Sequence, residues 1–104
     1  MKFICFKTTT DDKKIANAIC EKAVSKGYSP CTSIKKIETN YIWNEKNVKS
    51  DEYQIEIKSI EKFSNYIVEL IKKNSNYTVP EITSNYINIH NDEYKNWYLK
   101  CLNQ

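Results

Sequence analysis

The spacing of apolar residues changes along the chain, and these changes predict alternating strands and helices. The apolar run KFICFKTTT at residues 2–10 is typical of a buried strand. Isoleucine and alanine then recur at helical spacing between residues 15 and 23, after Asp11 or Asp12, either of which can cap a helix. Gly27, the only glycine in the chain, falls where a left-handed residue is expected to end this helix.

The middle of the chain predicts a long hairpin. Residues 31–43 have a strand-like pattern, with Thr39, Tyr41 and Trp43 on one face, and residues 50–59 alternate polar and apolar side chains. The polar stretch WNEKN between the two strands is typical of a turn. Both arms are longer than an average strand, so they are expected to extend past a small core. Their unpaired edges must then be covered or must pair with another chain.

The rest of the chain predicts a helix, a strand at residues 82–89 and a final helix. Ser59 and Asn91 are expected to cap the two helices. The residues expected to face the core are Ile60, Phe63, Ile67, Leu70 and Ile71 in the first helix and Tyr94, Trp97, Tyr98 and Cys101 in the second. The order βαββαβ with an added C-terminal helix predicts an α+β, ferredoxin-like fold, in one domain spanning residues 1–104.

Charge and composition argue against two functions that use this architecture. The net charge is +3, too small to indicate nucleic acid, and SDEYQIEIK puts carboxylates on the strand that an RNA-binding domain would use for bases. A phosphatase of this shape usually needs arginine beside a glycine-rich loop, and all 16 basic residues here are lysine.

The four cysteines show neither CxxC spacing nor a paired histidine, so neither a zinc ribbon nor a redox motif is indicated. Most of them are expected to be buried small residues. No apolar stretch is long enough to span a membrane, and the apolar run FICF is too short for a signal peptide. We therefore expect a cytoplasmic protein with reduced thiols that binds neither membranes nor nucleic acid.

Five stretches of the chain resemble, in order, motifs of the CutA1 family, the divalent-cation tolerance proteins. They are FICFKTTTDDKKIA, SPCTSIKKIETNYIWNEK, EYQIEIKS, NYTVPEI and NDEYKNWYL. The resemblance implies a homotrimer assembled through the long hairpins, which agrees with the extended arms predicted above. It also implies a role in tolerance to divalent metal ions, with copper as the candidate cofactor, and a signalling role by analogy with the trimeric PII proteins. It implies no enzymatic activity.

The resemblance also gives candidate site residues. Cys31 matches the family cysteine that is proposed as a copper ligand, since a thiolate is a soft donor; the alternative is a buried small residue at a subunit contact. Trp43 matches the tryptophan of the family hairpin, for which interface packing is the alternative role.

Five further residues match positions that the resemblance assigns to a cleft between subunits. Glu52 and Lys58 match a charged pair in the third strand, and the alternative for both is a solvated face. Tyr77, Pro80 and Glu81 match the Tyr-x-x-Pro-Glu segment. Proline is tolerated where a strand begins, and Glu81 is placed to meet a lysine of a neighbouring subunit.

The sequence departs from the family at two places. Members with a copper site carry histidine just before the Tyr-x-x-Pro-Glu segment, where this chain has Asn74, Ser75 and Asn76. The only histidine, His90, has no spaced partner and is expected to be a surface or capping residue. Glu45 replaces a turn glycine, so either a left-handed residue there costs roughly 1 kcal/mol or the turn adopts another shape.

These observations predict a trimeric, CutA1-like protein that binds divalent ions such as copper or responds to them. The alternative is a trimeric scaffold, or a PII-like module for a small ligand or partner, in which the metal role is reduced or lost. An enzyme that uses Lys58, Tyr77 and Glu81 is disfavoured, because no pair of nucleophile and base is visible.

Overall fold

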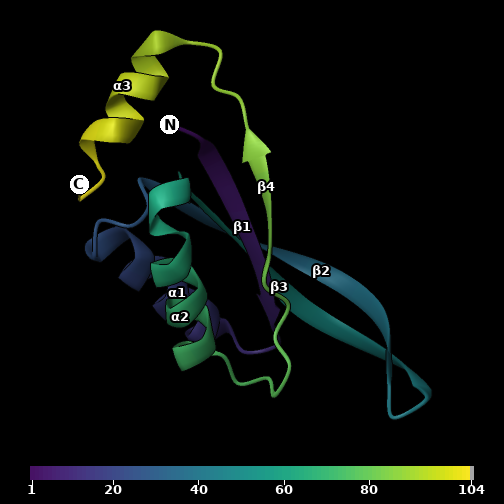
Figure 1. Ribbon diagram of the computed structural model, residues 1–104. Coiled ribbons are helices and arrows are strands. Elements are labelled where there is room, and N and C mark those ends of the chain that lie inside the picture. The colour runs from purple at the N-terminus through teal and green to yellow at the C-terminus, as the bar shows by residue number, and fades with distance from the viewer. Residues whose placement is uncertain (104) are drawn as a thin grey trace.

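The computed structural model describes residues 1–103, in which four strands form one antiparallel sheet of order β2–β3–β1–β4 (Figure 1). The elements are β1 (Phe3–Thr10), α1 (Lys13–Ser25), β2 (Cys31–Trp43), β3 (Lys46–Ile60), α2 (Ser64–Asn74), β4 (Thr83–Ile87) and α3 (Asp92–Lys100). This is the predicted split βαβ order with an added helix, so the α+β fold is confirmed. No helix in the described part of the chain is both long and apolar enough to cross a membrane.

The two faces of the sheet are covered differently. Helices α1 and α2 pack on the face that carries Ile55 and Ile57, both fully buried, and these isoleucines form the centre of the core. Helix α3 lies against the opposite face at one end, where Tyr98 packs edge-on against Phe3 with ring centroids 5.2 Å apart. We call this opposite side the outer face. Beyond α3 it continues toward the hairpin.

The first helix begins and ends as the sequence predicts. Asp12 caps α1, and its carboxylate accepts a hydrogen bond from the backbone N–H of Lys14 at 2.8 Å. Gly27 follows the helix with a φ of +74°, in the left-handed region that favours glycine.

Two expectations for the later helices were wrong, the Ser59 cap and the burial of Trp97 and Cys101. Ser59 does not cap a helix, because β3 continues to Ile60 and the buried Ser59 hydroxyl donates to the carbonyl of Tyr28 at 2.6 Å. Helix α2 begins only at Ser64, after a short 3-10 turn. Asn91 is the N-cap residue of α3, as predicted, and its side chain makes no capping hydrogen bond. Trp97 in α3 and Cys101 just after it are exposed, whereas Tyr98 faces the core as predicted.

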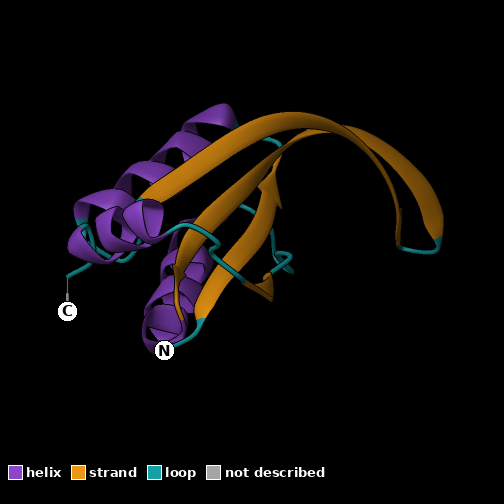
Figure 2. Cartoon of the chain, turned by 90° about the horizontal axis from the view of Figure 1, so that it is seen from above, coloured by secondary structure: helices purple, strands orange, loops and turns teal. Residues whose placement is uncertain are grey.

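The hairpin is longer than the sequence indicates, with strands of 13 and 15 residues (Figure 2). Strand β3 begins at Lys46, which pairs directly with Trp43, so the turn is only two residues long. Asn44 and Glu45 both have positive φ, 50° and 64°, as a type I′ turn requires. Glu45 therefore does occupy a left-handed position. The hairpin curves away from the rest of the molecule, and Ile42 and Trp43 near its tip are exposed.

A candidate binding pocket under the hairpin

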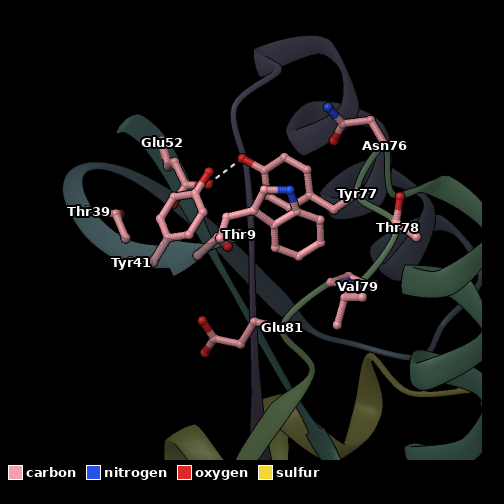
Figure 3. A pocket seen from close by; sticks show the side chains of 11 residues that line it. Thr9, Thr39, Tyr41, Glu52, Asn76, Tyr77, Thr78, Val79 and Glu81 are labelled. Carbon is pink, nitrogen blue, oxygen red and sulfur yellow. Dashed lines mark hydrogen bonds between the residues drawn. The ribbon is translucent and has the colours of Figure 1, made fainter. Parts of the chain in front are cut away.

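A pocket of about 540 Å³ lies on the outer face, between the hairpin and the segment that joins α2 to β4 (Figure 3). Strand β2 contributes Thr39, Tyr41 and Trp43, which alternate along the strand and therefore share the face predicted for them. Glu52 of β3, Thr9 of β1 and residues 76–81 complete the lining. We call this space the hairpin pocket.

Tyr77 and Glu52 point toward each other in the pocket wall, and the tyrosine hydroxyl donates a hydrogen bond to the carboxylate (Figure 3). Glu52 is only 4% exposed, an unusual place for a carboxylate unless a donor compensates for its lost hydration. Burial, and then the hydrogen bond to Glu52, raise the pKa of Tyr77 well above its ordinary value. Tyr77 therefore remains a hydrogen-bond donor at neutral pH.

Asn76 holds the loop side of the pocket against the end of β1. Its side-chain oxygen accepts a hydrogen bond from the Thr10 hydroxyl at 2.7 Å, and its nitrogen donates to Asp11 at 2.8 Å. The next residue is also fixed, because the backbone N–H of Tyr77 donates to the Ser75 hydroxyl at 3.1 Å. These contacts position Tyr77 opposite the hairpin.

The structure brings five of the predicted site residues together and leaves two elsewhere. The five that line the hairpin pocket are Trp43, Glu52, Tyr77, Pro80 and Glu81. Cys31 and Lys58 are not in the lining; they pair with each other across β2 and β3, at the start of β2. Lys58 also pairs with Cys5 on β1, so Cys31 lies toward the end of the sheet that α3 covers.

Six lining residues were not among the predicted cleft residues: Thr9, Thr39, Tyr41, Asn76, Thr78 and Val79. Tyr41 could have been found from its position two residues before Trp43, which places both on one face of a strand. Asn76 could not, because its partners Thr10 and Asp11 are 65 or more residues away in the sequence.

Within residues 1–103 the structure contains no group of three or more His, Cys, Asp or Glu side chains that could hold a metal ion. Asn74, Ser75 and Asn76, at the positions where the resemblance led us to look for a histidine ligand, make structural contacts. Asn74 donates to the Leu70 carbonyl at 2.7 Å and accepts from Lys22, and Ser75 and Asn76 fix the loop as described. His90 is exposed just before α3.

Comparison with known proteins gives one consistent result. A family model described as CutA1 divalent ion tolerance protein matches residues 4–101. A probable divalent-cation tolerance protein cutA homolog from Encephalitozoon cuniculi (strain GB-M1) is 30% identical over 83 residues, which cover 80% of this chain and 72% of that protein.

Solved structures agree with this match. CutA1 from Oryza sativa has a TM-score of 0.93 and 25% identity, with coverage of 100% of this chain and 96% of that one. CutA1 from Shewanella sp. SIB1 has a TM-score of 0.92 and 24% identity, covering 99% and 97% of the two chains. At this lower identity the likeness establishes the fold alone.

Proposed function

The chain belongs to the CutA1 family of divalent ion tolerance proteins, and from this premise we propose that it acts in the response to divalent metal ions. We propose further that it does so as a homotrimer in which Cys31 provides a soft ligand for copper. A signalling role and the absence of catalysis are part of the same proposal.

The observation that carries the proposal is the long hairpin, in which one edge of strand β2 is not paired with another strand. Strand β2 is an edge strand of 13 residues, and Ile42 and Trp43 near its tip are 70% and 50% exposed. Long exposed edges and large apolar side chains favour pairing with another copy of the chain. Cys31, a half-buried free thiol, begins the same strand. Assembly along β2 would let neighbouring copies provide the additional metal-coordinating side chains that one copy lacks.

Light scattering tests the assembly. The trimer predicts a mass three times that of the 12.3 kDa chain. A monomer at micromolar concentration would contradict the proposed architecture.

Calorimetric titration with copper tests the metal role. We expect micromolar binding in the parent, loss of that binding in Cys31→Ser, and no change in Cys101→Ser, a matched control because Cys101 is an exposed thiol at the end of α3. Equal binding by the parent and Cys31→Ser would remove Cys31 from the proposal.

A second candidate function is favoured by the hairpin pocket. If copper does not bind, the chain is better described as a trimeric scaffold or a module for a small ligand or protein partner. The pocket and the structural contacts of Asn74 and Asn76 support this alternative, since both asparagines hydrogen-bond within the fold. Thermal shift measurements with small ligands test the binding module. If no ligand stabilises the protein, the trimeric scaffold is the remaining alternative.

A further inference from the structure

We propose that the hairpin pocket binds an alkylammonium group, held by the carboxylate of Glu52 and by the aromatic rings of Tyr41, Trp43 and Tyr77. This goes beyond the proposed metal response, because it requires neither copper nor Cys31. The argument rests on the charge of the lining, on polar atoms without partners and on accessible aromatic rings.

The lining is acidic in a chain that is otherwise basic. The sequence has 16 lysines and one histidine, yet none of them lines the pocket, whereas Glu52 and Glu81 do. Asp11 adds a third carboxylate close by, through its hydrogen bond with Asn76. A phosphate or carboxylate ligand would therefore meet negative charge without a cationic partner, and a cationic ligand is favoured.

Two polar groups in the pocket wall still have hydrogen-bonding capacity. Tyr77 donates to Oε2 of Glu52, and within residues 1–103 no hydrogen bond to Oε1 of the same carboxylate is found, so this oxygen can accept from a ligand. The Thr39 hydroxyl oxygen is buried and has no hydrogen-bond partner in the same part of the chain. Buried polar groups are normally paired. A primary alkylammonium group carries only N–H donors, so it matches a carboxylate oxygen that lacks one, whereas a quaternary group such as that of choline meets the carboxylate by charge alone.

The aromatic residues favour an organic cation over a hydrated metal ion. In the single chain Tyr41 is 38% exposed and Trp43 50%, so a free ligand or a side chain of a second copy can reach their rings. Four lysines in the described residues lie over aromatic rings, for example Lys2 over Tyr86 at 4.7 Å, but none of them lies over a ring of the pocket. The face of an aromatic ring attracts ammonium groups, and a carboxylate beside it strengthens the attraction.

The ammonium group can come from two sources with the same chemistry. One is a free small amine, and the other is the side chain of a lysine from a second copy of the chain. The test therefore needs the assembled protein and the protein diluted below its association range, as determined by light scattering.

The experiment uses Trp97→Phe, in which Trp43 is the only indole and reports on the pocket by fluorescence. EDTA is present throughout, so failure of copper binding cannot affect the result. Choline and butylammonium are titrated, with dimethylbutanol as the neutral isostere of choline. We expect a saturable change for both cations and at least about tenfold weaker binding of the neutral isostere, a difference that corresponds to one cation–carboxylate or cation–ring contact.

Variants in the same background locate the site. Glu52→Gln should weaken choline binding about tenfold. Glu81→Gln, at an exposed residue that leaves the fold intact, should weaken it several-fold, which keeps the test valid if Glu52→Gln does not fold. Glu38→Gln is the matched control, because Glu38 is exposed on β2 and alternates with Ile37 and Thr39 onto the other face.

The outcomes separate clearly. A response at all protein concentrations identifies a site for free amines, and a response that appears only on dilution identifies a lysine of a second copy as the occupant. Equal affinity for choline and its neutral isostere would overturn the proposal. So would unchanged binding in both glutamate variants, or the absence of a saturable response in both the assembled and the diluted protein.

Discussion

The outer face of the sheet has two ends, and each contains a tyrosine whose hydroxyl is used as a donor. At the end covered by α3, Tyr98 is fully buried and donates to the Ser59 carbonyl at 2.6 Å. At the hairpin end, Tyr77 is half-buried and donates to the carboxylate of Glu52. The first contact joins neutral groups inside a packed core, whereas the second helps to keep a charge beside an open pocket. The same residue type thus supports packing at one end and a binding site at the other.

The largest expected effect on stability comes from removing the packing at the end covered by α3. Tyr98→Ala deletes a fully buried ring and leaves a cavity between α3 and the sheet, so we expect a loss of about 3–5 kcal/mol in the free energy of unfolding. Trp97→Ala is the control on the same helix, and since Trp97 is 44% exposed its cost should stay below about 1 kcal/mol. Urea unfolding at one fixed protein concentration measures both, and equal costs would break the comparison.

The second test concerns the contact between α1 and the segment after α3. Gly27 has a φ of +74°, and a Cβ there would lie 2.4 Å from the Cβ of Asn103. Gly27→Ala should therefore lower the free energy of unfolding by about 1–3 kcal/mol. Adding Asn103→Gly removes the 2.4 Å contact and should recover part of the cost, because the backbone N and Cα of residue 103 still lie 3.1 and 3.3 Å from the added Cβ and the left-handed backbone conformation still costs roughly 1 kcal/mol. Urea unfolding of Gly27→Ala, Asn103→Gly and the double variant measures the steric contribution, and a cost of Gly27→Ala that Asn103→Gly does not reduce would argue against the steric contact.

A third test uses pH at the covered end. Burial, and then interaction with Tyr94, raise the pKa of Tyr98 above its ordinary value of 10.0. Below pH 10 the buried, protonated Tyr98 makes its full contribution to the free energy of unfolding. Above pH 10 the unfolded chain loses the proton while the folded protein keeps it, so stability falls with rising pH, by at most about 1.4 kcal/mol per pH unit for this group.

Tyr98→Phe removes that titration and is the variant to compare. Near pH 7 it should be about 1 kcal/mol less stable than the parent, because the Ser59 carbonyl loses its donor. The difference should narrow above pH 10, in unfolding curves recorded from pH 7 to about pH 11. For Tyr77→Phe the difference in the free energy of unfolding from the parent should narrow less above pH 10, since Tyr77 is half-buried and better hydrated. Parallel curves for the parent and Tyr98→Phe would contradict the raised pKa of Tyr98.

The smallest expected effect is at the tip of the hairpin. Glu45 has a φ of 64°, so Glu45→Gly should raise the free energy of unfolding by about 0.5–1 kcal/mol. Asn47→Gly, two residues later in the extended part of β3, should instead lower it by a similar amount. The two variants are compared by thermal unfolding. Equal shifts in the same direction would mean that the turn conformation does not determine the effect.

Much of the fold could be predicted from the sequence because the apolar spacing is regular. The stripe in α2 and the alternation in β3 reflect burial on one face, and Gly27 marks the end of α1. Ser59 misled the prediction, since a serine before an apolar stripe resembles a helix cap. The pairing of Ile60 with Phe3 of β1 extends the strand past it, and no local pattern encodes that pairing.

The candidate site could be predicted only in part, for a related reason. The resemblance to a family supplied Trp43, Glu52, Tyr77, Pro80 and Glu81, which the structure brings to one pocket. It did not reveal that Tyr77 and Glu52 are hydrogen-bonded to each other, because two residues 25 positions apart meet only when the hairpin curves over the loop.

The position of β1 in the centre of the sheet has a consequence for synthesis of the chain. Phe3 pairs with Ile60 on one side and with Ile87 on the other, so both partners of β1 are translated long after it. The hairpin can form from neighbouring segments, whereas β1 has to wait for the chain to return twice. Both edges of β1 therefore remain unpaired on the ribosome until β3 and then β4 emerge. The first strand to be made is the last to be enclosed, and the nascent chain is most prone to misassociation through it.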